Sequence, residues 1–167
     1  MRKQSGFTLI EVMVAVFVLA IGVLGMAGMQ ATGVREAQNT YFRTQADMLA
    51  NDIVDRMRAN RQQVIDDTTY LTAGADPGVA NTCGAMGGGA VEECDGQTMA
   101  GFDLQSWYNA INSSNLPSAT GVITQVAGSA TTYTIQVFWD ENRDGSNDQV
   151  CGNTLGQDGC VRLTVEF

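Results

Sequence analysis

Hydrophobic residues are unevenly distributed along the chain. From Phe7 to Met29 there are 23 residues with one charged side chain, Glu11. At about 1.5 Å of rise per residue, a helix of this length crosses a hydrocarbon core about 30 Å thick. A buried core helix is the alternative, but so long and apolar a segment favours a helix that spans a membrane.

The helical pattern continues beyond this span and becomes amphipathic. From Gln30 to about Asn60 there is no proline, and apolar residues recur every three or four positions. This periodicity predicts one apolar face that packs on a sheet, so one helix is expected from about Phe7 to Asn60. The residues of that face are Phe42, Ala46, Leu49, Ile53 and Met57.

A connector, a short helix and a sheet are expected after the long helix. Residues 66–100 are rich in Gly, Ala, Asp and Thr, which is typical of a long connector. Residues 103–113 predict a helix with Asp103 as its N-cap and Trp107 as a core anchor. Three strands are predicted at Val122–Val126, Thr132–Asp140 and Val161–Phe167.

The best of these strands alternates regularly. Tyr133, Ile135, Val137 and Trp139 are expected to point to one side, and Phe138 to the other. A long helix laid on an antiparallel meander of three or four strands is an α+β fold.

Composition excludes several functions. The net charge is −9, and an acidic surface argues against nucleic acid as a partner. The chain has no histidine, its one lysine is Lys3, and there is no nucleophile motif of the Gly-x-Ser-x-Gly kind, so an enzyme is not expected.

Four cysteines follow the apolar span. Cys83, Cys94, Cys151 and Cys160 contain no CxxC pair, and an even count at loop-like positions predicts two disulfides in an oxidising compartment. Zinc is the alternative, but its ligands usually come in closer pairs. Of three connectivities, Cys83–Cys94 with Cys151–Cys160 is predicted because each bond closes a short local loop.

The first thirty residues fit three kinds of hydrophobic segment. The apolar stretch is too long for a cleaved secretory signal, whereas a simple anchor fits its length. A plain anchor gives no reason for Glu11, since a carboxylate in an apolar span costs about 2.5 kcal/mol or more. Glu11 therefore needs a partner, although a side chain this near the end of the span could also reach the interface.

The segment Lys3–Val12 resembles the class III signal of type IV prepilins and pseudopilins. This resemblance implies that a membrane prepilin peptidase cuts after Gly6, that Phe7 is N-methylated and that Glu11 acts in assembly. It also implies the "lollipop" fold, a long helix with a globular head. The new amine at Phe7 would pair with Glu11 of a neighbouring subunit, so that two unfavourable groups compensate each other.

The domain organisation expected from this resemblance has four parts. Residues 1–6 are the leader, 7–29 the transmembrane and filament-core helix, 30–61 its amphipathic half and 62–167 a periplasmic head. The protein would sit in the inner membrane with one span before assembly, and then in the pilus at or near its tip.

The run Gln45–Arg61 resembles that of PilV-type minor pilins, also called type IV pilus modification proteins. This implies a minor pilin that takes part in priming and assembly of pili, and so supports twitching motility and adhesion. The implied partners are other minor pilins, the major pilin, a large tip adhesin and the inner-membrane assembly platform. Arg56, Arg58 and Arg61 either tie the helix end to the head or contact another subunit.

Two other functions remain open. A minor pseudopilin of type II secretion shares the leader and the fold, and a membrane-anchored periplasmic binding protein shares the span. The first would be distinguished by its neighbouring genes, and the second has no use for Glu11.

One loop resembles the first part of an EF-hand calcium loop. Asp140, Asn142 and Asp144 occupy positions 1, 3 and 5, Gly145 position 6, and Ser146 and Asp148 could add oxygens. Position 12 lacks the usual glutamate, and a hairpin turn explains the same residues. Calcium is the one cofactor that the sequence suggests.

Overall fold

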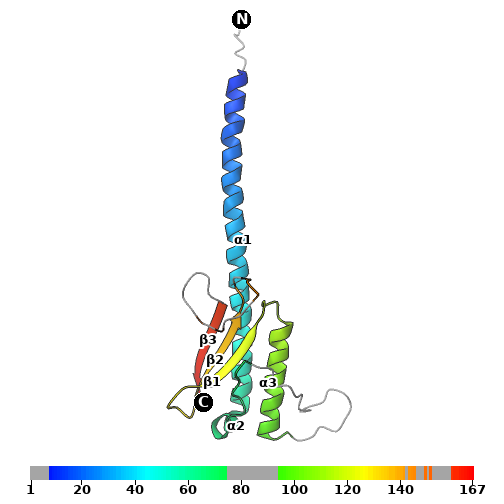
Figure 1. Ribbon diagram of the computed structural model, residues 1–167, viewed down its shortest axis with the longest axis vertical. Coiled ribbons are helices and arrows are strands. Elements are labelled where there is room, and N and C mark those ends of the chain that lie inside the picture. Colours follow the sequence, from blue (N-terminus) through cyan, green and yellow to red (C-terminus); the bar gives the residue numbers. More distant parts are fainter. Residues whose placement is uncertain (1–7, 75–93, 142, 146–148, 150, 152–158) are drawn as a thin grey trace, which may run out of the picture. The chain divides into compact units, whose positions relative to one another are not determined.

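The computed structural model describes residues 8–74, 94–141, 143–145, 149, 151 and 159–167. Within these ranges the order of elements is α1, α2, α3, β1, β2, β3 (Figure 1). Two compact units make up the chain, Met1–Thr40 and Tyr41–Phe167, and helix α1 (Leu9–Ala59) contributes to both. The predicted fold class, a long N-terminal helix with an antiparallel sheet, is confirmed.

The sheet is an antiparallel meander in the order β1-β2-β3. Its strands are β1 (Thr120–Gln125), β2 (Thr132–Trp139) and β3 (Gly159–Glu166). Ile135 of β2 lies opposite Ile123 of β1 and also opposite Leu163 of β3. The three predicted strands are present with small shifts at their ends.

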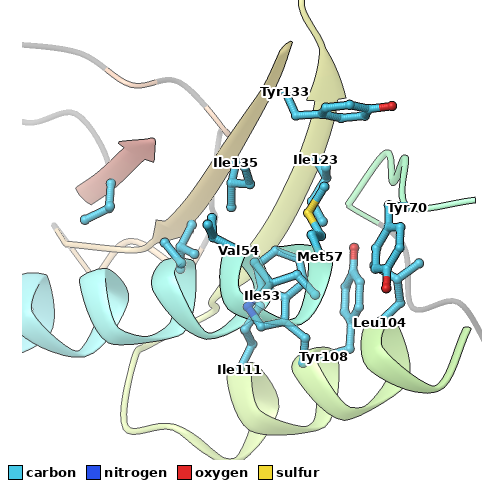
Figure 2. Close-up of a cluster of buried hydrophobic side chains, with 14 of the residues drawn as sticks. Ile53, Val54, Met57, Tyr70, Leu104, Tyr108, Ile111, Ile123, Tyr133 and Ile135 are labelled. Carbon is cyan, nitrogen blue, oxygen red and sulfur yellow. The ribbon is translucent and has the colours of Figure 1, made fainter. Parts of the chain in front are cut away.

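The core of the second unit lies between the sheet, the C-terminal part of α1 and α3 (Gly96–Ser113) (Figure 2). The predicted apolar face of α1 is confirmed, with Phe42 and Leu49 only partly buried at its edge. Ala50 and Val54, which the periodicity did not select, are also buried on this face, so the face is wider than predicted. The buried residues of α1 are Ala46, Ala50, Ile53, Val54 and Met57.

Helix α3 begins seven residues earlier than predicted, and its N-cap is Asp95. The Asp95 carboxylate accepts a hydrogen bond from the backbone N–H of Thr98 at 2.7 Å, as a capping side chain does. This hydrogen bonding to Thr98 lowers the pKa of Asp95. The prediction that Asp103 is the cap was therefore wrong, because Asp103 lies inside the helix and is 6% exposed.

Buried aromatic side chains join distant elements through their polar tips. Trp107 is fully buried and donates its indole N–H to the carbonyl oxygen of Leu49 in α1, at 2.7 Å. The Tyr133 hydroxyl of β2 donates to the carbonyl of Val64 in α2 (Arg61–Asp66) at 2.5 Å. Such residues combine a large apolar surface with one directed hydrogen bond, so they fix how the elements pack. Trp107 is a core anchor, as predicted.

The face of the sheet opposite the core is also partly covered. Phe138 points to that face but is 2% exposed. It lies opposite Cys160 of β3, and the Cys151–Cys160 disulfide brings Cys151 to within 3.4 Å of the Gln136 amide. The alternation therefore predicted the correct face of the sheet for Phe138. At this position, however, that face is buried and not exposed to solvent.

Close packing of Gly121 against Trp107 gives a testable prediction. A methyl group at Gly121 would lie 2.4 Å from Cη2 of the Trp107 ring and 2.7 Å from Cδ1 of Ile111. In a soluble variant that begins at residue 30, Gly121→Ala should lower the free energy of unfolding by about 1–3 kcal/mol, measured by urea denaturation.

The control for this prediction is Gly33→Ala on an open stretch of α1, where an added methyl meets no atom within 4 Å. Equal stability of the Gly121→Ala and Gly33→Ala variants would contradict the packing described for Trp107.

Candidate functional site

The N-terminal part of α1 presents a long apolar surface. Its large hydrophobic side chains between Leu9 and Met29 are 53% to 79% exposed. Among the described residues, α1 is the helix long and apolar enough to cross a membrane. A surface of this size is unstable in water, so it has to be covered by lipid or by protein.

Glu11 is the one acid in this apolar stretch, and it lies in the first turn of α1. Its backbone N–H donates to the carbonyl oxygen of Thr8 at 3.1 Å, so the helix starts next to it. A carboxylate is favourable there because the first backbone N–H groups of a helix carry partial positive charge. Glu11 is thus placed where a second positive group can approach from the helix start. The predicted cleavage residues Gly6 and Phe7 lie outside the described part of the chain.

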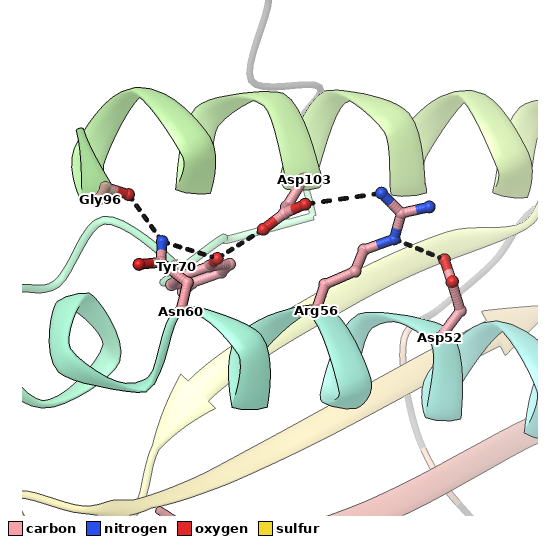
Figure 3. A network of polar contacts seen from close by, with 6 residues as sticks. All are labelled: Asp52, Arg56, Asn60, Tyr70, Gly96 and Asp103. Carbon is pink, nitrogen blue, oxygen red and sulfur yellow. Dashed lines mark hydrogen bonds and ion pairs between the residues drawn. The ribbon is translucent and has the colours of Figure 1, made fainter. Parts of the chain in front are cut away.

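A polar network joins the end of α1 to α3 (Figure 3). Arg56 pairs with Asp52 one turn earlier, with Nε and Oδ2 3.0 Å apart. The same guanidinium reaches Asp103 in α3, where Nη1 and Oδ1 are 3.5 Å apart. Arg56 therefore ties the end of α1 to the rest of its own unit, which is one of the two roles predicted for it.

Asp103 is the centre of this network. Its Oδ2 accepts a hydrogen bond from the Tyr70 hydroxyl at 2.7 Å. Burial raises the pKa of Tyr70, and the hydrogen bond to Asp103 raises it further. The Asn60 amide follows the last turn of α1 and donates to Tyr70 at 3.2 Å and to the Gly96 carbonyl at 2.7 Å. Helix α1, the segment that contains Tyr70 and helix α3 therefore meet at one buried carboxylate.

The other two arginines of this region are on the surface. Arg58 pairs with Asp55 at 2.9 Å, and both side chains are more than half exposed. Arg61 is exposed at the start of α2. An exposed pair of this kind contributes little to stability.

Comparisons with known protein families cover the part of the chain that contains both features. A family model for the prokaryotic N-terminal methylation motif matches residues 1–27, and a model described as type IV pilin Tt1218 matches residues 28–105. The two matches adjoin, and they include Glu11 and all residues of the polar network. The chain belongs to the type IV pilin family.

Membership has direct consequences for this pilin. Type IV pilins are structural subunits of pili, which interact with other pilins and with membrane machinery, and they are not enzymes. Neither curated proteins nor solved structures gave a match to the chain. The sheet with its disulfide lies beyond the matched residues, so it is described by its structure alone.

The cysteines of the pilin are consistent with an oxidising compartment. Cys151 and Cys160 form a disulfide with their Cα atoms 5.2 Å apart, which is the predicted pairing. Cys94 is also disulfide-bonded. Cys83 lies outside the described residues.

The loop with the calcium-like sequence is described in part. Asp140 is 3% exposed, and its carboxylate accepts hydrogen bonds from the backbone N–H groups of Asp144 at 3.2 Å and Gly145 at 2.9 Å. These bonds stabilise a turn. Asn142, Ser146 and Asp148 lie outside the described residues. Within the described ranges no group of three or more His, Cys, Asp or Glu residues is placed to hold a metal.

Sequence reasoning missed the role of Asp103, although a signal was present. Ala100, Leu104, Trp107 and Ile111 form the buried face of α3, and Asp103 falls on that face. A carboxylate on an apolar face requires a partner. Its partners Tyr70 and Arg56 are far away in sequence and could not be found from local spacing.

The network predicts that replacing two different carboxylates lowers the free energy of unfolding by different amounts. In the soluble variant, Asp103→Ala leaves the buried Tyr70 hydroxyl without its acceptor and should lower the free energy of unfolding by about 2 kcal/mol. As the control, Asp55→Ala breaks only the exposed pair with Arg58 and should change it by no more than about 0.5 kcal/mol. Urea denaturation measures both. Similar values for the two variants would mean that the network adds nothing to stability.

Proposed function

We propose that this pilin is a minor pilin that takes part in priming and assembly of type IV pili, and thereby supports twitching motility and adhesion. The observation that carries the proposal is Glu11, the one acid of a long exposed apolar helix, placed in its first turn. The resemblance of Gln45–Arg61 to PilV-type minor pilins supports the minor role.

The proposed maturation supplies the partner of Glu11. A prepilin peptidase removes residues 1–6 by cutting after Gly6, and Phe7 becomes an N-methylated amine. Residues 7–29 then form the membrane and filament-core helix, residues 30–61 its amphipathic half, and residues 62–167 the periplasmic head. In a bundle of parallel helices, the amine of one subunit pairs with Glu11 of the next, so neither charge is left alone in an apolar core.

The proposed location follows from this maturation. Before assembly the protein lies in the inner membrane with its C-terminus in the periplasm, and afterwards it lies in the pilus at or near the tip. Its partners are the assembly platform, the major pilin, other minor pilins and a large tip adhesin. These are implied by the resemblance and by the pilin family.

Replacement of Glu11 tests the proposal. Glu11→Ala should leave the second unit folded and the chain in the membrane, while its amount in sheared pili falls about tenfold or more, because a lone amine in an apolar core costs more than about 1.4 kcal/mol. Immunoblots of sheared pili and of membranes measure both quantities. Glu36→Ala is the control, since Glu36 is an exposed acid of α1 outside the apolar span.

Wild-type amounts of the Glu11→Ala variant in pili would contradict the pairing. Absence of the wild-type chain from pili, together with loss of protein secretion when its gene is deleted, would instead assign the chain to type II secretion.

Calcium binding by the loop that starts at Asp140 stays a prediction. If the loop holds calcium, calorimetric titration of the soluble variant gives a binding signal that Asp140→Ala abolishes. No signal at millimolar calcium would end this prediction.

A further inference from the structure

The sheet of the second unit has one protected edge and one open edge. Strand β1 lies at the edge next to α3, and its outward carbonyl groups accept hydrogen bonds (Figure 1). The backbone N–H of Thr72 donates to the carbonyl oxygen of Ile123 at 3.0 Å. The hydroxyls of Thr72 and Tyr108 donate to the carbonyl oxygen of Gly121 at 3.3 Å and 2.7 Å. Strand β3 lies at the other edge, and no described residue pairs with its outer side.

The direction of the backbone groups at the open edge follows from one hydrogen bond just beyond β3. The N–H of Phe167 donates to the carbonyl oxygen of Thr131 at 2.9 Å, so the backbone of Phe167 faces β2. In an antiparallel ladder, successive residues direct their N–H and C=O groups to opposite sides. Arg162, Thr164 and Glu166 therefore direct theirs away from β2, to the side on which no described residue pairs with them.

The core beside this edge is not fully covered. The side chains of β2 that face the core are at most 2% exposed, whereas their neighbours Leu163 and Val165 on β3 face the same core and are only partly buried. Strand β3 contains neither a proline nor a lysine, two residues that commonly protect an edge strand from pairing. Both the backbone and the apolar side of β3 are therefore arranged as they are when another strand follows.

A second copy of this chain does not fit the open edge. Antiparallel pairing of β3 with β3 would make the C-terminal parts of two α1 helices run in opposite directions, because α1 packs flat on the sheet. Two spans anchored in one membrane run in the same direction. Parallel pairing would turn the second sheet over and bring its polar face next to Leu163 and Val165. Lipid does not fit either, because its chains offer no hydrogen-bonding groups to the backbone.

We propose that the open edge of β3 binds an extended segment of a partner protein, which adds a fourth strand to the sheet. The backbone of such a segment supplies donors and acceptors to Arg162, Thr164 and Glu166. Its side chains alternate, with apolar residues that cover Leu163 and Val165 and polar residues on the outer face. The inference goes beyond the proposed function, because the edge belongs to the second unit whatever assembly the chain joins.

Amide exchange tests the edge, with alternate residues of β3 as an internal control. In the full-length chain purified alone in detergent, the N–H groups of Arg162 and Thr164 should exchange at least about tenfold faster than those of Val161 and Leu163, which are bonded to β2. In membranes or sheared pili isolated without detergent, the partner segment should slow exchange at Arg162 and Thr164 about tenfold or more. Slow exchange at both residues in detergent, or equally fast exchange in all three samples, would overturn the inference.

Proline at the edge is the matched substitution. Thr164→Pro removes one outward N–H that is not bonded to β2, which an edge strand tolerates, and it should abolish the slowing of exchange at Arg162. Thr164→Val keeps the N–H and should retain the slowing. Retained slowing in the Thr164→Pro variant would contradict strand addition.

Cross-linking tests the same contact without a defective variant, and so decides the question even if Thr164→Pro fails to fold. A photo-reactive residue at position 164 of the full-length chain should give adducts at alternate residues of one extended partner segment. The control is position 124, which is exposed on β1 and should give no adducts with that segment. Adducts scattered over a partner, or none, would overturn the inference. Absence of the chain from pili would contradict the proposed function alone, since the exchange and the cross-links can be measured in membranes.

Discussion

The long apolar stretch of α1 is the constraint on which the rest of the structure depends. It is too apolar to stay in water, so every state of the protein has to cover it, first with lipid and then with other subunits. One carboxylate, Glu11, is kept in this stretch despite its cost, at the position where the helix start favours negative charge. The helix thus carries both an apolar surface that has to be covered and, in the proposed function, the polar group that pairs with the amine of the next subunit.

The second unit serves this helix by holding its C-terminal part in a fixed position. The apolar face of α1 packs on the sheet, and the indole of Trp107 binds the Leu49 carbonyl. At the last turn, Arg56 and Asn60 are joined to α3 through Asp103 and Tyr70. The C-terminal part of α1 is therefore held to α3 and the sheet by packed side chains and directed hydrogen bonds.

Periodicity predicted the elements of this protein well, because they are long and strongly patterned. Both the recurrence of apolar residues in α1 and the alternation in β2 can be recognised from residues that are close together in the sequence. The N-cap of α3 was misplaced because Asp95 and Asp103 both suit a helix start, and only the backbone distinguishes them. Asp103 accepts a hydrogen bond from Tyr70, which is 33 positions away, and Phe138 is buried although it lies on the outer face of the sheet. Neither has a local signature.

The mass of the native protein in assembled pili tests the central claim most directly, since the pairing of Glu11 requires a free amine next to the apolar helix. Mass spectrometry of this chain from sheared pili should show a polypeptide that begins at Phe7 and carries one added methyl group at its amine. A chain in assembled pili that still contains residues 1–6 would have no such amine beside Glu11 and would contradict the account.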